Sequence, residues 1–162
     1  MSFGSGKRRQ RGFTLLELLA AAAILGILAS VAVPVVQTTV RREKERELRL
    51  ALRDIRSAID AYKAASVAGR IETGINESGY PPRLQDLAGG IPVKDKSGAL
   101  TIYFLRRLPR DPFADRSIAA ADTWVKRSFD SSPDAPREGA DVFDVASRSP
   151  LMGLNGVPYA QW

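Results

Sequence analysis

The sequence predicts an α+β protein built on one very long N-terminal helix. Three observations support this fold class. Residues 13–36 form an apolar run, residues 37–68 follow with strong helix formers in an amphipathic pattern, and the chain from residue 69 onward is punctuated by glycine and proline. Such punctuation is typical of loops and short elements. One extended helix followed by a small domain is therefore the expected organisation.

The first twelve residues are polar and basic and show no apolar periodicity. Four of the 24 lysines and arginines lie there, and without them 20 basic residues face 18 acidic ones, so the formal net charge falls from +6 to +2. The later basic residues alternate with glutamate over 41–47. This alternation is typical of a solvated, salt-bridged helix face and not of a phosphate-binding stripe, so no nucleic-acid partner is expected.

Residues 13–36 carry a single charge, Glu17. At about 1.5 Å per residue, a helix of this length crosses a hydrocarbon core of about 30 Å, which predicts a transmembrane helix. A cleavable secretory signal is the nearest alternative, but this run is longer than an ordinary signal core and continues into a helical pattern. Seven basic residues follow the run closely, so the positive-inside rule does not decide the orientation.

The second part of the helix carries an apolar stripe at three- and four-residue spacing, which predicts a core-facing side. Its members are Leu48, Leu52, Ile55, Ile59 and Tyr62, with Ala51 and Ala58 on the same side. Gly69 is the expected stop. A single helix from Phe13 to Ala68 is about 80 Å long. Pro34 is expected to bend or locally open it, because proline lacks a backbone donor and clashes with the preceding turn.

Beyond Gly69 the sequence predicts short elements. One short helix is expected at 82–87, strands at 123–129 and 141–145, and either a strand or a helix at 100–105. The chain contains no cysteine and no histidine, which removes thiol nucleophiles, histidine bases and the usual zinc sites. Four carboxylates could be paired in space, namely those of Asp111, Asp115, Asp122 and Glu138. No sequence pattern brings any two of them together, so no enzymatic activity is expected.

Glu17 lies four residues inside the apolar run. An unpaired charge in hydrocarbon costs about 2.5–3.5 kcal/mol on insertion scales, so the carboxylate should have a partner. No lysine or arginine lies within the run. If the chain were cut between Gly12 and Phe13, the new ammonium of Phe13 could pair with Glu17 of its own or of an adjacent subunit. The alternative is a glutamate that reaches outward to the membrane surface.

The junction Gly12-Phe13-Thr14-Leu15-Leu16-Glu17, followed by the apolar run and Pro34, resembles the N-terminal signature of type IV prepilins and type II secretion pseudopilins. The resemblance implies that a membrane-embedded aspartyl prepilin peptidase cleaves after Gly12 and methylates Phe13. It also implies that Glu17 pairs with the terminus of a neighbouring subunit and that Pro34 bends the helix. The expected divisions are a leader at 1–12, a transmembrane and assembly segment at 13–36, an amphipathic segment at 37–68 and a small periplasmic domain at 69–162.

The remaining sequence is similar to the G-type major pseudopilins at 79–87 and 103–112, and also at 141–145 and Trp162. This resemblance implies a long helix packed on a small antiparallel sheet, in a structural subunit of a periplasmic type II secretion filament. The implied partners are further copies of the chain, the prepilin peptidase, an inner-membrane assembly platform and minor pseudopilins. The implied location is the bacterial inner membrane, crossed once, with the C-terminal domain in the periplasm. A major or minor type IV pilin serving motility, adhesion or DNA uptake is the alternative.

Members of this family typically bind calcium through a glycine- and aspartate-rich loop near the C-terminus, and no such loop aligns cleanly here. Four aspartates supply oxygen ligands of a suitable kind, namely Asp130, Asp134, Asp141 and Asp144. Their spacing matches no calcium motif, and surface carboxylates are the simpler interpretation. No cofactor or metal residue is therefore assigned, and calcium in the C-terminal domain stays an open alternative.

Overall fold

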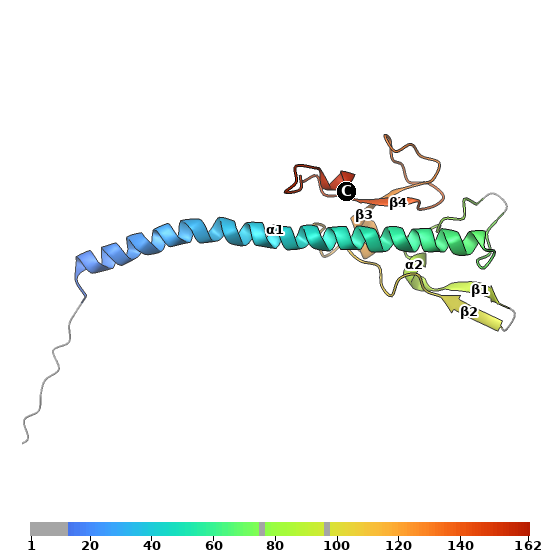
Figure 1. The fold of residues 1–162 in the computed structure, drawn as a ribbon, viewed down its shortest axis with the longest axis horizontal. Helices are drawn as coiled ribbons and strands as arrows, with labels where there is room; N and C mark the ends of the chain where they lie inside the picture. Colours follow the sequence, from blue (N-terminus) through green and yellow to red (C-terminus); the bar gives the residue numbers. More distant parts are fainter. Residues whose placement is uncertain (1–12, 75–76, 96–97) are drawn as a thin grey trace, which may run out of the picture. The chain divides into compact units, whose positions relative to one another are not determined.

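The structure is a computed structural model that describes residues 13–74, 77–95 and 98–162 (Figure 1). Helix α1 (Leu15–Val67) dominates it. The chain divides into two compact units, Met1–Arg41 and Arg42–Trp162, so that α1 contributes its first part to one unit and its second part to the other. The two units are described separately below. The basic leader expected at 1–12 lies outside the described residues.

Helix α1 ends where the sequence predicts. The main-chain N–H of Arg70 donates to Ala65 O at 3.0 Å and that of Gly69 donates to Ser66 O at 2.9 Å, which is the Schellman pattern. Gly69 has a φ of 71°, a conformation that glycine adopts without steric cost. The helix also continues through Pro34 without interruption of its range, so the local opening expected there is wrong.

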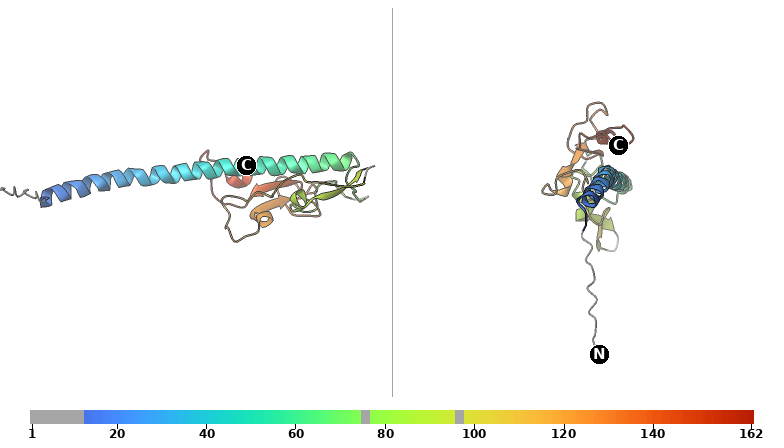
Figure 2. Two further views of the ribbon diagram at one scale, coloured as in Figure 1. Left: turned by 90° about the horizontal axis from the view of Figure 1, so that it is seen from below. Right: turned by 90° about the vertical axis from the view of Figure 1, so that its left-hand side faces the viewer.

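The core of the second unit is built on the predicted stripe of α1. Every member of the stripe from Leu48 to Tyr62 is buried. They pack against residues from the rest of the unit, among them Leu84, Trp124 and Tyr159, each fully buried. Within this unit the strands and loops gather along one side of α1 and leave its other side uncovered (Figure 2). The apolar stripe is thus the structural centre of the unit.

The first antiparallel pair joins β1 (Ile91–Asp95) to β2 (Gly98–Ile102), just after the short helix α2 (Asp86–Gly89). Strand β2 covers residues 100–102 of the segment 100–105, whose type the sequence left open, and residues 103–105 belong to neither a strand nor a helix. Strand β1 was not predicted, because Pro92 interrupts its pattern; proline is tolerated in a strand that lies at a sheet edge. The short helix starts four residues later than expected, since residues 82–85 form a turn in which the Arg83 N–H donates to Asp86 Oδ2 at 3.1 Å.

The second antiparallel pair joins β3 (Trp124–Arg127) to β4 (Asp144–Ser147). The expected strand at 123–129 contains β3, preceded by the 3-10 turn η1 (Ala120–Thr123). The strand expected at 141–145 is wrong in its bounds. The N–H groups of Val142 and Phe143 donate instead to Pro81 O and Arg127 O, both at 2.8 Å, so regular pairing begins only at Asp144. A second 3-10 turn, η2 (Tyr159–Gln161), closes the chain.

These elements confirm the α+β class, with a long helix and antiparallel strands, although the strands form two separate pairs and not one sheet. The sequence predicts a salt-bridged charged face on α1, and the structure bears this out only in part. Arg49 lies 3.8 Å from Glu45. By contrast, in the described part of the chain no ion pair joins Arg42, Arg46 or Arg53 to a carboxylate.

Candidate assembly site

The N-terminus of α1 is capped by Thr14. The N–H of Glu17 donates to Thr14 Oγ1 at 3.2 Å, and the N–H of Leu18 donates to Thr14 O at 3.1 Å. Thr14 therefore occupies the N-cap position and Glu17 the third helical position, which is the threonine–glutamate spacing of a capping box. Sequence reasoning missed this role of Thr14, although the letters TLLE before an apolar run are a recognisable signal for it.

Glu17 lies in the first turn of α1 and is exposed. An acidic residue at this position interacts favourably with the N-terminal end of the helix dipole. Within the described residues its carboxylate has neither a salt bridge nor a hydrogen bond. The structure therefore places Glu17 four residues after Phe13, on a capped helix end, with its charge available to another group.

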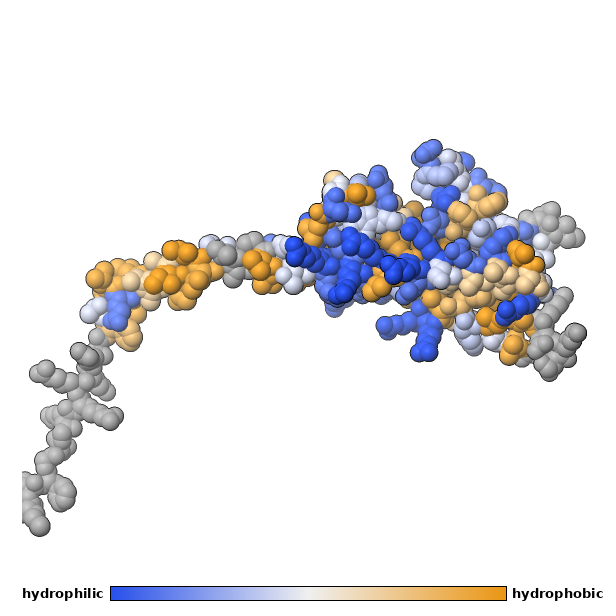
Figure 3. Space-filling model, in the orientation of Figure 1, coloured by the Kyte–Doolittle hydropathy of each residue, from blue (hydrophilic) through white to orange (hydrophobic). Residues whose placement is uncertain are grey.

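The apolar side chains that follow are uncovered in the single chain. Phe13, Leu15 and Leu16 are each at least three-quarters exposed, and the exposed side chains continue through Leu28 (Figure 3). By length and composition α1 is able to cross a membrane, with a mean hydropathy of 2.5 in its most apolar window. An apolar surface of this extent requires lipid or other protein around it.

Polar side chains of this region are turned onto the helix backbone. Ser30 Oγ donates to Ile27 O at 2.7 Å, and Thr39 Oγ1 donates to Val35 O at 3.0 Å. These bonds satisfy hydroxyl groups within the helix, which lowers the cost of placing them in an apolar environment. They flank Pro34, whose missing N–H leaves one helical carbonyl without its usual donor. Gly12, the residue expected before the cut, lies outside the described residues.

The carboxylates considered for catalysis are engaged separately in local structure. Asp111 is buried and accepts a hydrogen bond from the Ser147 hydroxyl, while Asp122 lies 3.7 Å from Lys126. Glu138 lies 3.8 Å from Arg148. Asp115 accepts hydrogen bonds from the N–H and hydroxyl of Ser117, both at 2.8 Å, and these bonds lower the pKa of its carboxyl. Each group thus has a structural partner of its own.

The four aspartates considered as calcium ligands do not act together either. Asp144 pairs with Arg56 at 2.8 Å and with Arg127 at 3.7 Å, and Asp141 accepts the Phe129 N–H at 2.9 Å. Asp130 and Asp134 are exposed. Across the described residues, no group of three or more acidic side chains is close enough to hold a metal ion.

The C-terminal residues are hydrogen-bonded to two charged residues of α1, the buried Glu45 and the half-buried Arg56, and sequence reasoning missed both roles. Glu45 Oε1 accepts the Tyr159 hydroxyl at 2.9 Å and the Leu154 N–H at 2.7 Å. Arg56 donates to Val145 O at 3.0 Å and to the main-chain oxygen of Trp162 at 2.7 Å. In sequence both residues look like ordinary members of a charged helix, because no local pattern separates them from their exposed neighbours.

Comparison with known proteins finds a match to the N-terminal region and matches that cover most of the chain. The family model described as the prokaryotic N-terminal methylation motif matches residues 7–33. The chain is 31% identical over 113 residues to the type II secretion system core protein G of Pectobacterium carotovorum subsp. carotovorum, covering 69% of this chain and 67% of that protein. The core protein G of Klebsiella pneumoniae is 31% identical over 110 residues, covering 65% of this chain and 71% of the relative.

A shorter match is found to the type IV major pilin protein PilA of Myxococcus xanthus, 36% identical over 74 residues, which covers 46% of this chain and 33% of the pilin. No solved structure matches the chain. The core protein G relatives cover most of this chain and of their own length, and the methylation motif spans the capped, uncovered end of α1. The chain therefore belongs to the family of type II secretion system core protein G, the G-type pseudopilins.

Proposed function

We propose that this chain is a structural subunit of a periplasmic filament of a type II secretion system. The observation that carries the proposal is the N-terminal junction. A glycine precedes a capped helix whose first turn holds one charge, Glu17, and whose following turns expose apolar side chains on every face. The methylation motif matched over residues 7–33 and the core protein G relatives support the same function.

In this proposal the chain acts by processing and assembly and catalyses no reaction. Prepilin peptidase removes residues 1–12 by cutting between Gly12 and Phe13, and Phe13 becomes the methylated terminus. Residues 13–36 first anchor the subunit in the bacterial inner membrane and later pack between subunits of the filament. Residues 37–68 carry the small domain at 69–162, which faces the periplasm. The further partners are the inner-membrane assembly platform and the minor pseudopilins.

Glu17, Phe13 and Pro34 are the assembly residues of this proposal. The Phe13 ammonium of one subunit pairs with Glu17 of its neighbour, so that each charge in the apolar filament interior is compensated by the other. Thr14 accepts the Glu17 main-chain N–H and so fixes the end of the helix that carries the Glu17 carboxylate toward the neighbour. Pro34 bends the helix between its membrane part and its periplasmic part.

A type IV pilin is the second candidate function, and the match to the Myxococcus xanthus pilin favours it. That match covers less than half of this chain, whereas the core protein G relatives cover about two thirds of it. Deleting the gene distinguishes the two functions. Loss of protein secretion with intact motility and DNA uptake supports the secretion filament, and the opposite pattern supports the pilus.

Processing is the direct test of the proposed function. Mass spectrometry of the protein purified from its native host should find a chain that begins at methylated Phe13. The same host without prepilin peptidase should yield a chain that retains residues 1–12, which serves as the control. An intact N-terminus in cells with active peptidase contradicts the proposal.

A further inference from the structure

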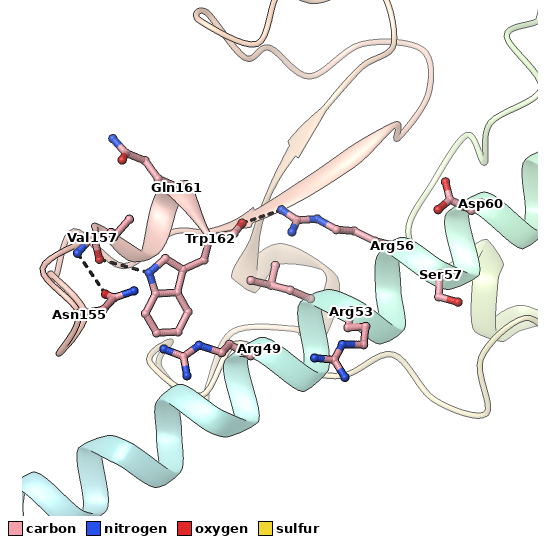
Figure 4. A pocket seen from close by; sticks show the side chains of 10 residues that line it. Arg49, Arg53, Arg56, Ser57, Asp60, Asn155, Val157, Gln161 and Trp162 are labelled. Atoms are coloured by element: carbon pink, nitrogen blue, oxygen red, sulfur yellow. Dashed lines mark hydrogen bonds between the residues drawn. The ribbon is translucent and has the colours of Figure 1, made fainter.

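The second unit has an open groove of about 710 Å³ between α1 and the C-terminal residues (Figure 4). Arg49 and Arg53 line this arginine groove from the helix, and Val157 and Trp162 line it from the opposite side. The Arg49 guanidinium lies over the Trp162 ring, 4.3 Å from its centre. Arginine and tryptophan are among the residue types that most often anchor a protein interface. The groove therefore has the composition of a docking site for another protein segment.

The arginines of this groove differ in whether the chain itself neutralises them. Arg56 donates to Asp144 and to two main-chain oxygens. Arg49 has Glu45 at 3.8 Å, and the Arg49 side chain is still 53% exposed. Arg53 is exposed and has neither an ion pair nor a hydrogen bond with any described residue. Arg49 and Arg53 are thus able to bind acidic groups from outside the chain.

A second exposed surface of the same helix carries the opposite charge. Glu43 and Glu47 are exposed, and in the part of the chain that the structure describes neither carboxylate has an ion pair or a hydrogen bond. Leu50 follows Glu47 on the same face and is 49% exposed. This acidic stripe (Glu43, Glu47 and Leu50) combines two carboxylates with an apolar side chain, and it is therefore the chemical complement of the arginine groove.

The acidic stripe and the arginine groove occupy different faces of α1. At 3.6 residues per turn, the stripe lies about 110° around the helix axis from Arg49 and Arg53. Within each surface the two charged residues are four apart, a spacing at which like charges repel and opposite charges attract. The helix thus separates charges that would stabilise it more if they were mixed. A partner that brings the opposite charge to each face removes this repulsion.

We propose that the acidic stripe of one copy of the chain docks into the arginine groove of the next copy along the filament, an inference that rests on the proposed function. The two helices run parallel, because all copies enter the filament from one membrane. Glu43 lies beside Arg49 of the next copy. Glu47 lies beside Arg53, since both pairs have the same four-residue spacing. The copies are then displaced by six residues, about 9 Å along the helix, and Leu50 enters the groove.

This contact joins two different faces of the chain. Each copy uses its stripe for one neighbour and its groove for the other, so the contact is head-to-tail. With a displacement along the axis, a head-to-tail contact does not close into a ring and continues as an open helical assembly. An exposed ion pair contributes little by itself, but this contact recurs at every subunit.

The same register excludes Asp54 from the attraction. Asp54 is exposed and follows the acidic stripe on the same face, but a six-residue displacement places it beside Asp60, the acidic residue of the groove lining. Like charges that face each other across an interface are disfavoured. Asp54 and Glu47 have similar surroundings in their own chain, because both line a smaller groove with the loop at 107–110. Asp54 is therefore a matched control for Glu47.

Charge reversal in the full chain tests the contact, with filament yield from the native host measured at matched membrane levels. Glu47→Lys and Arg53→Glu are each expected to lower the yield at least about ten-fold, because each places like charges together at every subunit. Asp54→Lys is expected to keep at least the parent yield. Co-expression of the Glu47→Lys and Arg53→Glu chains is expected to restore filaments, since each reversed residue then faces an opposite charge. A folding defect would not be restored in this way.

The absence of cysteine from the chain allows a direct measurement of the contact. Full chains carrying Glu47→Cys are co-expressed with full chains carrying Arg53→Cys and treated with a short bis-maleimide. A mixed dimer is expected, and neither variant alone is expected to give a dimer, because the contact does not bring a residue against itself. Asp54→Cys chains with Arg53→Cys chains are the control and are expected to give several-fold less mixed dimer.

Three results overturn the inference. Normal filament yield from Glu47→Lys or Arg53→Glu means that these charges make no contact between copies. Equal losses from Glu47→Lys and Asp54→Lys, or no restoration on co-expression, mean that the paired residues are different ones. A dimer from chains with one cysteine position means that the contact is two-fold. Absence of filaments from the parent chain, or retention of residues 1–12, removes the proposed function as well; parent filaments without the cross-link between positions 47 and 53 remove this inference alone.

Discussion

The Glu45 carboxylate accepts the Tyr159 hydroxyl at 2.9 Å across 114 residues of sequence, in a site where both side chains are buried. The same carboxylate oxygen accepts the Leu154 N–H. A hydrogen bond to a charged group is worth about 1.5–3 kcal/mol, and a buried donor left without its acceptor adds a desolvation cost. Glu45 is therefore, with Arg56, one of two charged residues of α1 that bind the C-terminal residues, and it is the buried one.

Glu45→Ala should lower the free energy of unfolding of the second unit by about 3 kcal/mol, because it leaves the Tyr159 hydroxyl and the Leu154 N–H without their acceptor. Glu47→Ala, an exposed acidic position on the same helix, is the matched control and should change stability by less than about 0.5 kcal/mol. Urea denaturation of a fragment that starts at Arg42 measures both. Equal effects of the two substitutions contradict the role given to Glu45.

The buried face of α1 could be predicted from the sequence, whereas its long-range polar contacts could not, and the reason is physical. The stripe from Leu48 to Tyr62 follows the helical period, so local spacing predicts which face is buried. Glu45 belongs to a run of alternating charges, and its burial depends on Tyr159, which folds onto it from the far end of the chain. Contacts of that separation leave no local pattern.

The strands likewise differ in how well local sequence predicts them. Strand β3 has β-branched and aromatic residues in a local pattern and was predicted within its expected range. Strand β4 starts at Asp144 because the main chain of Val142 is bonded to Pro81, a long-range contact that periodicity does not reveal. In the candidate assembly site, the charge of Glu17 within an apolar run predicts an assembly role, which stays a prediction. The Thr14 cap was not predicted, although the threonine–glutamate spacing that signals it is local.

The buried Tyr62 provides a test of the core. Tyr62 is 5% exposed, and its ring lies 5.4 Å from that of Phe104. Tyr62→Asp places a carboxylate without a partner in this core and should cost several kcal/mol, enough to unfold a small domain. Leu50→Asp, on the exposed side of the same helix, is the control and should preserve a cooperative thermal transition. Cooperative melting of the Tyr62 variant at an unchanged temperature would show that the stripe is not the core.

Tyr62 also predicts a dependence of stability on alkaline pH. Burial raises the pKa of its hydroxyl above the ordinary value of 10.0, and the nearby charges of Asp86 and Glu77 add to the shift. The folded state thus retains this proton at a pH where the unfolded chain has lost it. The stabilising contribution is complete below pH 10 and is lost as the pH rises through the folded-state pKa.

The melting temperature should accordingly fall between neutral pH and about pH 11, and Tyr62→Phe should fall less steeply because it removes the titrating hydroxyl while keeping the ring. The comparison is between the slopes of the two proteins, since lysines and the other tyrosines titrate in both. Tyr103→Phe, at a 63% exposed tyrosine, is the control and should follow the parent chain. Identical slopes for the parent and Tyr62→Phe contradict the assignment.

Glu17 gives the sharpest test of assembly. If its carboxylate pairs with the Phe13 ammonium of a neighbouring subunit, Glu17→Leu leaves that ammonium uncompensated in an apolar environment, at a cost of a few kcal/mol per subunit. The variant should still enter the membrane, because it is more apolar, and should still be cleaved, because the Gly12–Phe13 junction is unchanged. Filament yield should fall sharply. Glu17→Asp should give an intermediate yield, since the charge is kept with a shorter reach.

The measurement is the amount of filament sheared from cells that express each variant at matched membrane levels. Thr14→Ser is the control, because serine retains the hydroxyl that accepts the Glu17 N–H and should leave the helix end capped. Methylated Phe13 in the Glu17→Leu protein, detected by mass spectrometry, separates an assembly defect from a processing defect. Normal filament yield from Glu17→Leu would mean that Glu17 reaches outward to the membrane surface and makes no pair with the neighbouring terminus.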